Sequence, residues 1–382
     1  MVPRPIIIVG SGLAAWTTIK ELRKHDAQVP VVMVTASSGD AYPKPALSTA
    51  FAQGKQADQL RNGLAADLAA AQHIQLHAHT RALSLDLAAQ QLHTSDGVLD
   101  YSRLVLAHGA NPIRIPLQGD AAEQVLSVNQ LEDYAVLRKR LRPGAKVLIM
   151  GAGLIGCEFA NDLINAGFKV HVVDPSLRPL AALLPEETGT QLQSALSKLG
   201  VVWHWGNSVT HVHQAAIGLQ AQLQSGEALQ VDVVLSAIGL RANTAWLTAA
   251  GLQCDRGVLV NAFLQTSDPH VFALGDVAQY ASAGNRTLPY VMPIMTAARA
   301  LGASLGGQAT EVVFPIMPVA VKTPALPLLI APPAVGSDGV WTGLEDGVWQ
   351  FKNASGKCLG FVLAGAQTAQ RVKAMQWLNA SL

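Results

Sequence analysis

Cysteine is scarce in this chain of 382 residues, which has only Cys157, Cys254 and Cys358. Three widely spaced cysteines are an odd number, so a disulfide framework is not expected. They form no Cys-x-x-Cys pair and no Cys/His cluster, so no metal site is predicted. This use of cysteine favours a reducing compartment, and we expect a cytoplasmic protein.

Charge and long apolar runs are also scarce. Charged residues make up 14% of the chain, against ~25% in an average globular protein, and hydrophobic residues make up 50%. The formal net charge of +1 argues against broad electrostatic binding of nucleic acid. No apolar run approaches the ~20 residues of a membrane-spanning helix, and Ile6–Val9 is too short for a signal-peptide core. We therefore expect two or three domains with large cores and no membrane partner.

Two segments of the chain share one pattern. Residues 5–24 and 145–164 each combine a short apolar run, a G-x-G-x-x-(A/G) turn and apolar residues at helical spacing. A second strand-like run follows each of them, at 30–35 and at 169–174. Parallel strands need a crossover helix, so both units predict parallel sheets covered by helices, which is an α/β fold.

Three further runs, at 104–107, 233–238 and 271–274, are also typical of strands. The last ~60 residues alternate short apolar runs with Pro and Gly, which predicts a small antiparallel sheet. A terminal helix is predicted over Gln367–Leu378.

The glycine turns suit dinucleotides. In such a turn the first glycine permits a tight bend, the second lets the backbone approach a pyrophosphate, and the third small residue keeps helix and strand close. The helix N-terminus adds unpaired N–H groups and the positive end of the helix dipole. One match alone could be a packing turn, but two matches with correct flanking strands predict two nucleotide sites. The positions are Gly10, Gly12 and Ala15 in the first turn, and Gly151, Gly153 and Gly156 in the second.

The residue that closes the second strand differs between the two units. In the second unit Asp174 can accept hydrogen bonds from the adenosine ribose, which favours NADH over NADPH, although Arg178 lies close by. The alternative is that Asp174 only ends a strand. In the first unit Thr35 and Ala36 replace the acid, so hydroxyl and backbone groups must hold that ribose.

These motifs carry a family resemblance. The two turns, the strand end at Gly109 and the segment Thr266–Asp276 come in the order found in FAD-dependent pyridine nucleotide oxidoreductases, which the chain resembles nearly end to end. Within that family, the segments Tyr42–Ser48, Leu154–Asp162 and Val321–Pro327 resemble bacterial rubredoxin–NAD(+) reductases.

The resemblance implies three domains, two of them Rossmann-like. An FAD-binding domain over 1–115 and 240–315 is interrupted by an NAD(H)-binding domain over 116–239. A small α+β interface domain follows over 316–382.

The resemblance also implies which residues bind the cofactors. NADH is assigned to the second turn and to Asp174. Lys44, Glu158 and Lys322 are placed near the flavin as catalytic residues, and a pairing of Lys44 with Glu158 across the domain boundary is a hypothesis. The implied FAD contacts are Gly10, Ser11, Gly12, Leu13, Ala14, Thr35, Lys44, the backbone near Arg81, Glu158, Asp276, Val291 and Lys322.

The residues themselves are compatible with these roles. Asp276 ends a strand at a glycine, where open α/β sheets bind ligands. Lys322 is the only charged residue between Glu311 and Asp338. Because burying an unpaired ammonium is costly, a partner such as a flavin carbonyl or the charge of reduced flavin is expected; the alternative is that the side chain reaches the surface.

The implied reaction is electron transfer from NADH through FAD to rubredoxin, with hydride passing to the flavin and single electrons leaving it. Disulfide reductases of the superfamily carry a cysteine pair after the first turn. Tyr42–Phe51 contains none, and Cys157 is interpreted as a small buried hydrophobe.

Several alternatives remain at this point. A ferredoxin or a rubredoxin-domain flavoprotein could be the acceptor. The chain could be a signalling protein that binds FAD and NADH without turnover, or an NADH oxidase or peroxidase, which normally needs a reactive cysteine. A monomer or weak homodimer is expected.

Overall fold

The structure is a computed structural model that describes residues 3–334 and 336–379. By their contacts the residues form two compact units. Lys44–Gln59 groups with unit 2, although the chain on both sides of it belongs to unit 1. The three predicted domains and their boundaries stay a prediction. Unit 1 consists of Met1–Pro43, Leu60–Asn111 and Leu240–Pro315, and unit 2 of Lys44–Gln59, Pro112–Gly239 and Ile316–Leu382.

Unit 1 is built on a parallel sheet with strand order β18-β7-β1-β2-β3. Strands β1 and β2 are buried throughout, as expected for strands covered on both faces. The strands are β1 (Ile6–Val9), β2 (Val31–Val34), β3 (Gln75–His77), β7 (Arg103–Leu106) and β18 (Val271–Ala273).

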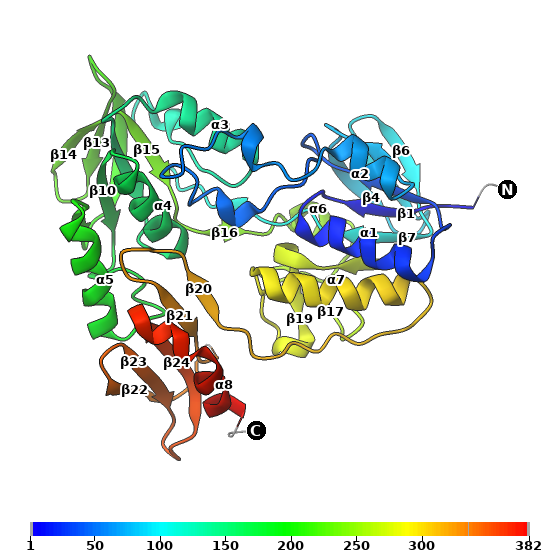
Figure 1. Ribbon diagram of the computed structural model, residues 1–382. Helices are drawn as coiled ribbons and strands as arrows, with labels where there is room; N and C mark the ends of the chain where they lie inside the picture. Colours follow the sequence, from blue (N-terminus) through cyan, green and yellow to red (C-terminus); the bar gives the residue numbers. More distant parts are fainter. Residues whose placement is uncertain (1–2, 335, 380–382) are drawn as a thin grey trace. The chain divides into compact units, whose positions relative to one another are not determined.

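Helices α1 (Leu13–His25) and α7 (Val291–Leu305) pack side by side on this sheet (Figure 1). Their backbones approach so closely that a Cβ on Gly302 would lie 2.5 Å from Cβ of Glu21. Unit 1 also contains the antiparallel sheet β4-β5-β6 and the parallel pair β17-β19. The bounds are β4 (Ala82–Asp86), β5 (Gln91–Thr94), β6 (Gly97–Asp100), β17 (Val258–Val260), β19 (Ala278–Tyr280), α2 (Ala65–Ala71) and α6 (Ala245–Ala249); β8 (Asn111–Pro112) and β16 (Leu240–Arg241) have two residues each.

Unit 2 contains a second parallel sheet, with strand order β11-β10-β9-β15. An antiparallel sheet, β12-β13-β14, shares a core with β9 and β15. The elements are β9 (Lys146–Met150), β10 (Lys169–Asp174), β11 (Val202–Trp205), β12 (Val209–Gln214), β13 (Leu219–Leu223), β14 (Ala228–Val231), β15 (Val233–Ser236), α3 (Leu131–Arg140), α4 (Leu154–Asn165) and α5 (Glu186–Lys198).

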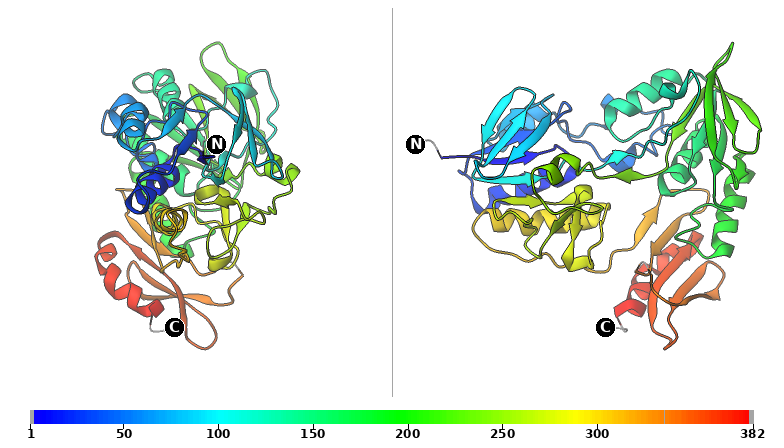
Figure 2. Two further views of the ribbon diagram at one scale, coloured as in Figure 1. Left: turned by 90° about the vertical axis from the view of Figure 1, so that its right-hand side faces the viewer. Right: turned by 180° about the vertical axis from the view of Figure 1, so that it is seen from behind.

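The end of the chain forms the predicted antiparallel sheet, with order β20-β21-β24-β23-β22, and helix α8 packs against it (Figure 2). Ala374 and Leu378 of α8 share a core with Phe361 and Leu363. The predicted helix begins later than expected, because Gly365–Gln370 forms a 3-10 turn, η6. The bounds are β20 (Val319–Val321), β21 (Leu328–Ala331), β22 (Val340–Glu345), β23 (Val348–Lys352), β24 (Cys358–Ala364) and α8 (Arg371–Asn379).

Two helix-covered parallel sheets and a small α+β segment confirm the predicted fold class. Within residues 3–334 and 336–379, every helix is too short or too polar to cross a bilayer.

Candidate functional site

The first glycine turn joins β1 to α1 in unit 1. Gly10 has a φ of +112°, and a Cβ there would collide with the carbonyl oxygen of Ala107. Around Gly12 the opposite holds, since no heavy atom of the described residues, apart from the two chain neighbours, lies within 4 Å of the place that a Cβ would take. In the described part of the chain, no side chain caps α1 at Gly12. A tight bend, an open backbone and an uncapped helix N-terminus fit a pyrophosphate.

Hydroxyl groups gather where the carboxylate of other dinucleotide sites would lie. Oγ of Ser11 is 2.9 Å from Oγ1 of Thr35 and 3.3 Å from Oγ of Ser37. Thr35 is buried at the end of β2, while Ser11 and Ser37 are half-buried. This cluster fits the expectation that hydroxyls replace the missing acid. Ser37 was not predicted, although its place two residues after Thr35 was a usable signal.

The other predicted FAD residues of unit 1 have unequal support. Asp276 lies in the 3-10 turn η4 (Gly275–Val277), and a Cβ on Gly275 would lie 3.2 Å from Cβ of Ala14 in the first turn. Val291 begins α7. The Arg81 backbone receives least support, because its N–H already donates to Ser95 Oγ and its carbonyl accepts from Ser95 N–H.

The second turn repeats this geometry in unit 2. Gly151 has a φ of +102°, a Cβ there would lie 2.7 Å from the carbonyl oxygen of Ala237, and the space at Gly153 is open. Gly156 packs against the carbonyl of Gly151, so the helix lies close to the strand. Asp174 closes the turn, since its Oδ2 accepts from the Ala152 N–H at 2.7 Å.

Each glycine turn packs against the residues that follow a neighbouring strand, β7 in unit 1 and β15 in unit 2, and these residues occupy equivalent positions in the two units. The Gly10 turn meets Ala107 and His108, and the Gly151 turn meets Ala237 and Ile238. Burial lowers the pKa of His108 to about 4, so the imidazole is neutral at pH 7.

Helix α4 presents a buried polar face one turn beyond the second glycine turn. Glu158, Asn161 and Asp162 are 5%, 1% and 5% exposed. Asp162 accepts hydrogen bonds from the N–H groups of Phe51 (2.7 Å) and Ala52 (3.0 Å).

Asn161 and Glu158 bind a second segment. Asn161 Oδ1 accepts from the Ala325 N–H at 3.0 Å, and Glu158 Oε1 accepts from the Lys322 N–H at 3.0 Å. Glu158 Oε2 also accepts from the hydroxyl of Ser48 at 2.5 Å. One helix face therefore holds Ser48–Ala52 and Lys322–Ala325, and this explains why Lys44–Gln59 groups with unit 2.

The structure distinguishes between the two interpretations of Lys322. Its side chain is 41% exposed, so it follows the alternative in which the side chain reaches the surface. Its Nζ donates to the carbonyl oxygen of Pro45 at 2.7 Å and lies 3.7 Å from Glu158 Oε2. Lys44 begins the 3-10 turn η1 (Lys44–Ala46) with an exposed side chain, and its pairing with Glu158 stays a prediction.

Cys157 lies inside α4 and is completely buried, with Sγ 3.3 Å from the carbonyl oxygen of Ala152. Burial raises the pKa of its thiol, so the thiolate needed for nucleophilic chemistry is disfavoured. The interpretation of Cys157 as a buried hydrophobe agrees with this environment.

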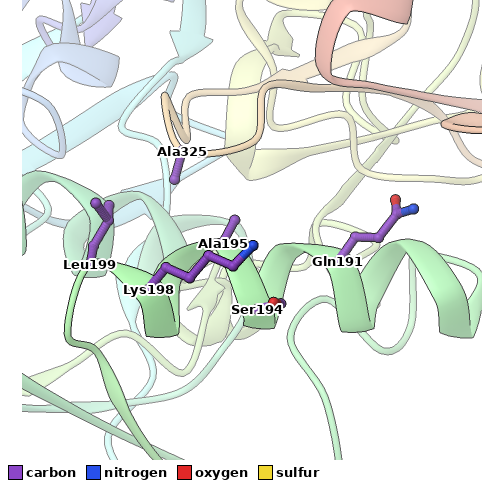
Figure 3. A pocket seen from close by; sticks show the side chains of 6 residues that line it. All are labelled: Gln191, Ser194, Ala195, Lys198, Leu199 and Ala325. Atoms are coloured by element: carbon purple, nitrogen blue, oxygen red, sulfur yellow. The ribbon is translucent and has the colours of Figure 1, made fainter.

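A pocket of about 450 Å³ lies in unit 2 between α5 and the loop that follows Lys322 (Figure 3). The side chain of Ala325 approaches the helix from that loop. The pocket contains none of the predicted cofactor residues, so we do not assign a nucleotide to it. Its lining residues are Gln191, Ser194, Ala195, Lys198, Leu199 and Ala325.

Comparison with known families identifies the class of protein. Residues 4–302 match the model for pyridine nucleotide-disulphide oxidoreductases, and residues 311–378 match that for the rubredoxin binding C-terminal domain. The first match spans well over half of the chain, which therefore belongs to the pyridine nucleotide-disulphide oxidoreductase family. The predicted oxidoreductase activity with FAD and NAD cofactors is thereby confirmed.

Individual relatives cover nearly the whole chain. A rubredoxin-NAD(+) reductase of Alcanivorax borkumensis is 43% identical over 97% of both chains. A nitric oxide reductase FlRd-NAD(+) reductase of Aeromonas hydrophila is 38% identical over 96% of this chain and 94% of its own. Among solved structures, the reductase in a covalent putidaredoxin reductase–putidaredoxin complex has a TM-score of 0.88 and 25% identity, covering 98% of this chain and 93% of its own.

Proposed function

We propose that the protein transfers electrons from NADH through FAD to rubredoxin. The observation that carries this proposal is the match of residues 311–378 to a rubredoxin binding domain, which coincides with the β20–β24 sheet and its loop at Lys322. The rubredoxin-NAD(+) reductase of Alcanivorax borkumensis supports the same acceptor. A cytoplasmic location belongs to this proposal, in keeping with three widely spaced cysteines.

The residue assignments follow the geometry of each unit. In unit 1 the open backbone at Gly12 binds the FAD pyrophosphate, the hydroxyls of Ser11 and Thr35 bind its ribose, and Asp276 binds the ribityl hydroxyls. The remaining contacts there are Gly10, Leu13, Ala14, the Arg81 backbone and Val291 at the N-terminus of α7.

In unit 2 the second turn, with Gly151, Gly153 and Gly156, binds NADH, and Asp174 binds its adenosine ribose. Lys44, Glu158 and Lys322 act at the flavin, where lysine ammonium groups favour negative charge on the reduced ring. When bound, FAD would supply hydride acceptance and the release of single electrons, so the residues of the chain would supply position and electrostatics.

A second acceptor is favoured by a specific observation. The Aeromonas hydrophila relative is named for a nitric oxide reductase FlRd, so a protein that carries a rubredoxin domain is the second candidate. A ferredoxin is the third. An oxidase or peroxidase function has less support, because Tyr42–Phe51 lacks cysteine and Cys157 is buried.

The decisive experiment is anaerobic stopped-flow spectroscopy of the FAD-loaded protein. The flavin is first reduced with NADH or NADPH and then mixed with oxidised rubredoxin, a rubredoxin-domain flavoprotein or ferredoxin. We expect fast bleaching by NADH and the fastest reoxidation by rubredoxin. Faster reoxidation by another carrier would assign that acceptor instead. Slow bleaching with no carrier response would indicate a protein without turnover, and rapid turnover with peroxide or oxygen would indicate an oxidase or peroxidase.

A further inference from the structure

We propose that Ser48 is a positioning residue for Glu158. Its hydroxyl and the main-chain N–H of Lys322 together hold the Glu158 carboxylate in one orientation for flavin reduction by NADH. This inference rests on the role proposed above for Glu158.

The argument begins with the two carboxylate oxygens, each of which has its own donor. Oε2 accepts from Ser48 Oγ at 2.5 Å, and Oε1 accepts from the Lys322 N–H at 3.0 Å. The two donors come from segments more than 250 residues apart in the chain, and each holds a different carboxylate oxygen. Rotation of the carboxylate breaks both bonds, and in a side chain that is 5% exposed little water is available to replace them.

The Ser48 hydroxyl has one proton, and the distances decide where it goes. The carbonyl oxygen of Pro45 is the other acceptor, but it lies 3.5 Å away, at the limit of a hydrogen bond. A bond to a carboxylate is also charge-assisted and roughly twice as strong as one between neutral groups. The hydroxyl therefore donates to Glu158.

The Lys322 ammonium does not compete with Ser48 for Glu158 Oε2. Its ammonium donates to the Pro45 carbonyl at 2.7 Å and is 3.7 Å from Glu158 Oε2, longer than a hydrogen bond. Ser48 is thus the side chain that donates to Glu158 at hydrogen-bond distance among the described contacts.

Helix α4 itself fixes the position of Ser48. Three and four residues further along, Phe51 and Ala52 donate their N–H groups to Asp162, one helical turn beyond Glu158. The segment that carries Ser48 is therefore attached to the helix that carries Glu158, and the hydroxyl needs no separate alignment. Ser48 is 3% exposed, so its rotamer is fixed by packing as well.

The first test is the single-turnover rate of flavin reduction by NADH, measured per bound flavin. Ser48→Ala should lower the limiting rate about tenfold while the apparent Kd for NADH stays within about twofold, because misplacing a reacting group acts on the chemical step. Ser48→Thr keeps the hydroxyl and should recover most of the rate. Thr49→Ala is the matched control, since among the described residues the Thr49 hydroxyl makes one weak hydrogen bond, to the Ala46 carbonyl at 3.4 Å, and its loss should leave the rate unchanged.

A double-mutant cycle separates positioning from a general loss of packing. In a Glu158→Ala background the acceptor is gone, so adding Ser48→Ala should change the rate less than twofold. An undiminished tenfold effect in that background would overturn the proposal. If Glu158→Ala is slow but Ser48→Ala is normal, only the role of Ser48 fails. If Glu158→Ala itself reduces flavin at the normal rate, the role of Glu158 in the proposed function fails too.

A crystal structure of Ser48→Ala without cofactor gives a readout that is independent of turnover. The Glu158 carboxylate should be displaced or divided between conformers, while Asp162 keeps both its bonds. A single, unmoved Glu158 would contradict the proposal.

Discussion

The two strand–turn–helix units of this protein share a glycine pattern, but they bury different faces of the helix that follows. Thr17, Lys20 and Glu21 of α1 occupy the positions, counted from the first glycine, that Glu158, Asn161 and Asp162 occupy in α4. On α1 these side chains are half-buried or exposed. On α4 all three are buried and accept backbone hydrogen bonds.

This difference in burial shows that the strand–turn–helix motif has two separate structural roles. The glycines determine the turn and its open backbone, whereas the outward positions of the helix determine which segments attach to it. Helix α1 comes close to α7 because Gly302 of α7 has no side chain at the point where it meets Glu21 and Leu22, and α4 uses polar residues to hold two loops. The residues around the turns differ in the same way, with Thr35 against Asp174 and His108 against Ile238.

The largest expected effect comes from the first glycine of each turn. An alanine at either position would have a positive φ and collide with a carbonyl, at a cost of ~3 kcal/mol or more. Gly10→Ala should yield protein without flavin, whereas Gly151→Ala should keep flavin but resist reduction by NADH. Visible absorption and NADH titration distinguish the two. Loss of flavin from both variants would show that the turns are not independent.

The next effect concerns the buried carboxylate that α1 lacks. Glu158→Gln removes the negative charge that we propose acts at the flavin, and should slow flavin reduction by NADH about 100-fold in single turnover, at unchanged flavin content. Thr17→Ala, at the matching position of α1, should stay within twofold. An unchanged rate for Glu158→Gln would refute its role.

Of the corresponding strand-end residues His108 and Ile238, only His108 can bind a proton. It should therefore make a contribution to folding stability that is lost at acid pH. Because burial lowers the pKa of the folded imidazole to about 4 from an ordinary 6.5, its stabilisation is fully present above pH 6.5 and is lost as the pH falls toward 4. Between pH 7.5 and 5 this loss is about 2 kcal/mol. The variant His108→Ile carries the residue type of Ile238. Its free energy of unfolding in urea, measured at pH 7.5 and at pH 5, should decrease less than that of the native protein, by about 2 kcal/mol. An equal decrease in His108→Ile and in the native protein would contradict this assignment.

A smaller effect is expected at Asp174, the residue that ends strand β10. Asp174→Ser gives the second unit a hydroxyl like that of the first, and should lower kcat/KM for NADH about tenfold. NADPH should lose less, because the carboxylate no longer repels its 2′-phosphate. Steady-state rates with both nucleotides test this, and an unchanged NADH/NADPH ratio would mean that Asp174 only supports the turn.

The smallest effect is expected at the hydroxyl cluster. Thr35→Val keeps the shape of the side chain but removes one hydrogen-bonding group, so FAD should bind about fivefold more weakly, or ~1 kcal/mol. Ser38→Ala nearby serves as the control. Equal FAD dissociation rates for Thr35→Val and the native protein would assign the ribose to other groups.

Much of the fold could be predicted because its signals are local. The glycine spacing and apolar runs located β1, β2, β9 and β10, since a turn and its flanking strands lie within 30 residues. The bonds from Glu158 and Asp162 to Ser48 and Phe51 span 110 and 111 residues, and no local pattern encodes them. For Lys322, the apolar neighbourhood in sequence leaves both a buried and an exposed side chain open; in the structure the lysine directly follows the short strand β20, and its side chain reaches the carbonyl of Pro45.

The buried face of α4 also bears on how such proteins can be recombined. Its first turn carries Gly156 of the turn assigned to NADH, and the next residues are Glu158, assigned to the flavin, and Asn161 and Asp162, which hold the two loops, all within 12 residues. A designer who transplants this nucleotide-binding turn into another flavoprotein would need the recipient to supply matching loops for positions 158, 161 and 162. A chimaera with a single joint anywhere between Ala52 and Lys322 would take at least one of the two loops from a different parent than its acceptors on α4, whereas a joint before Ser48 or after Ala325 would keep the set together.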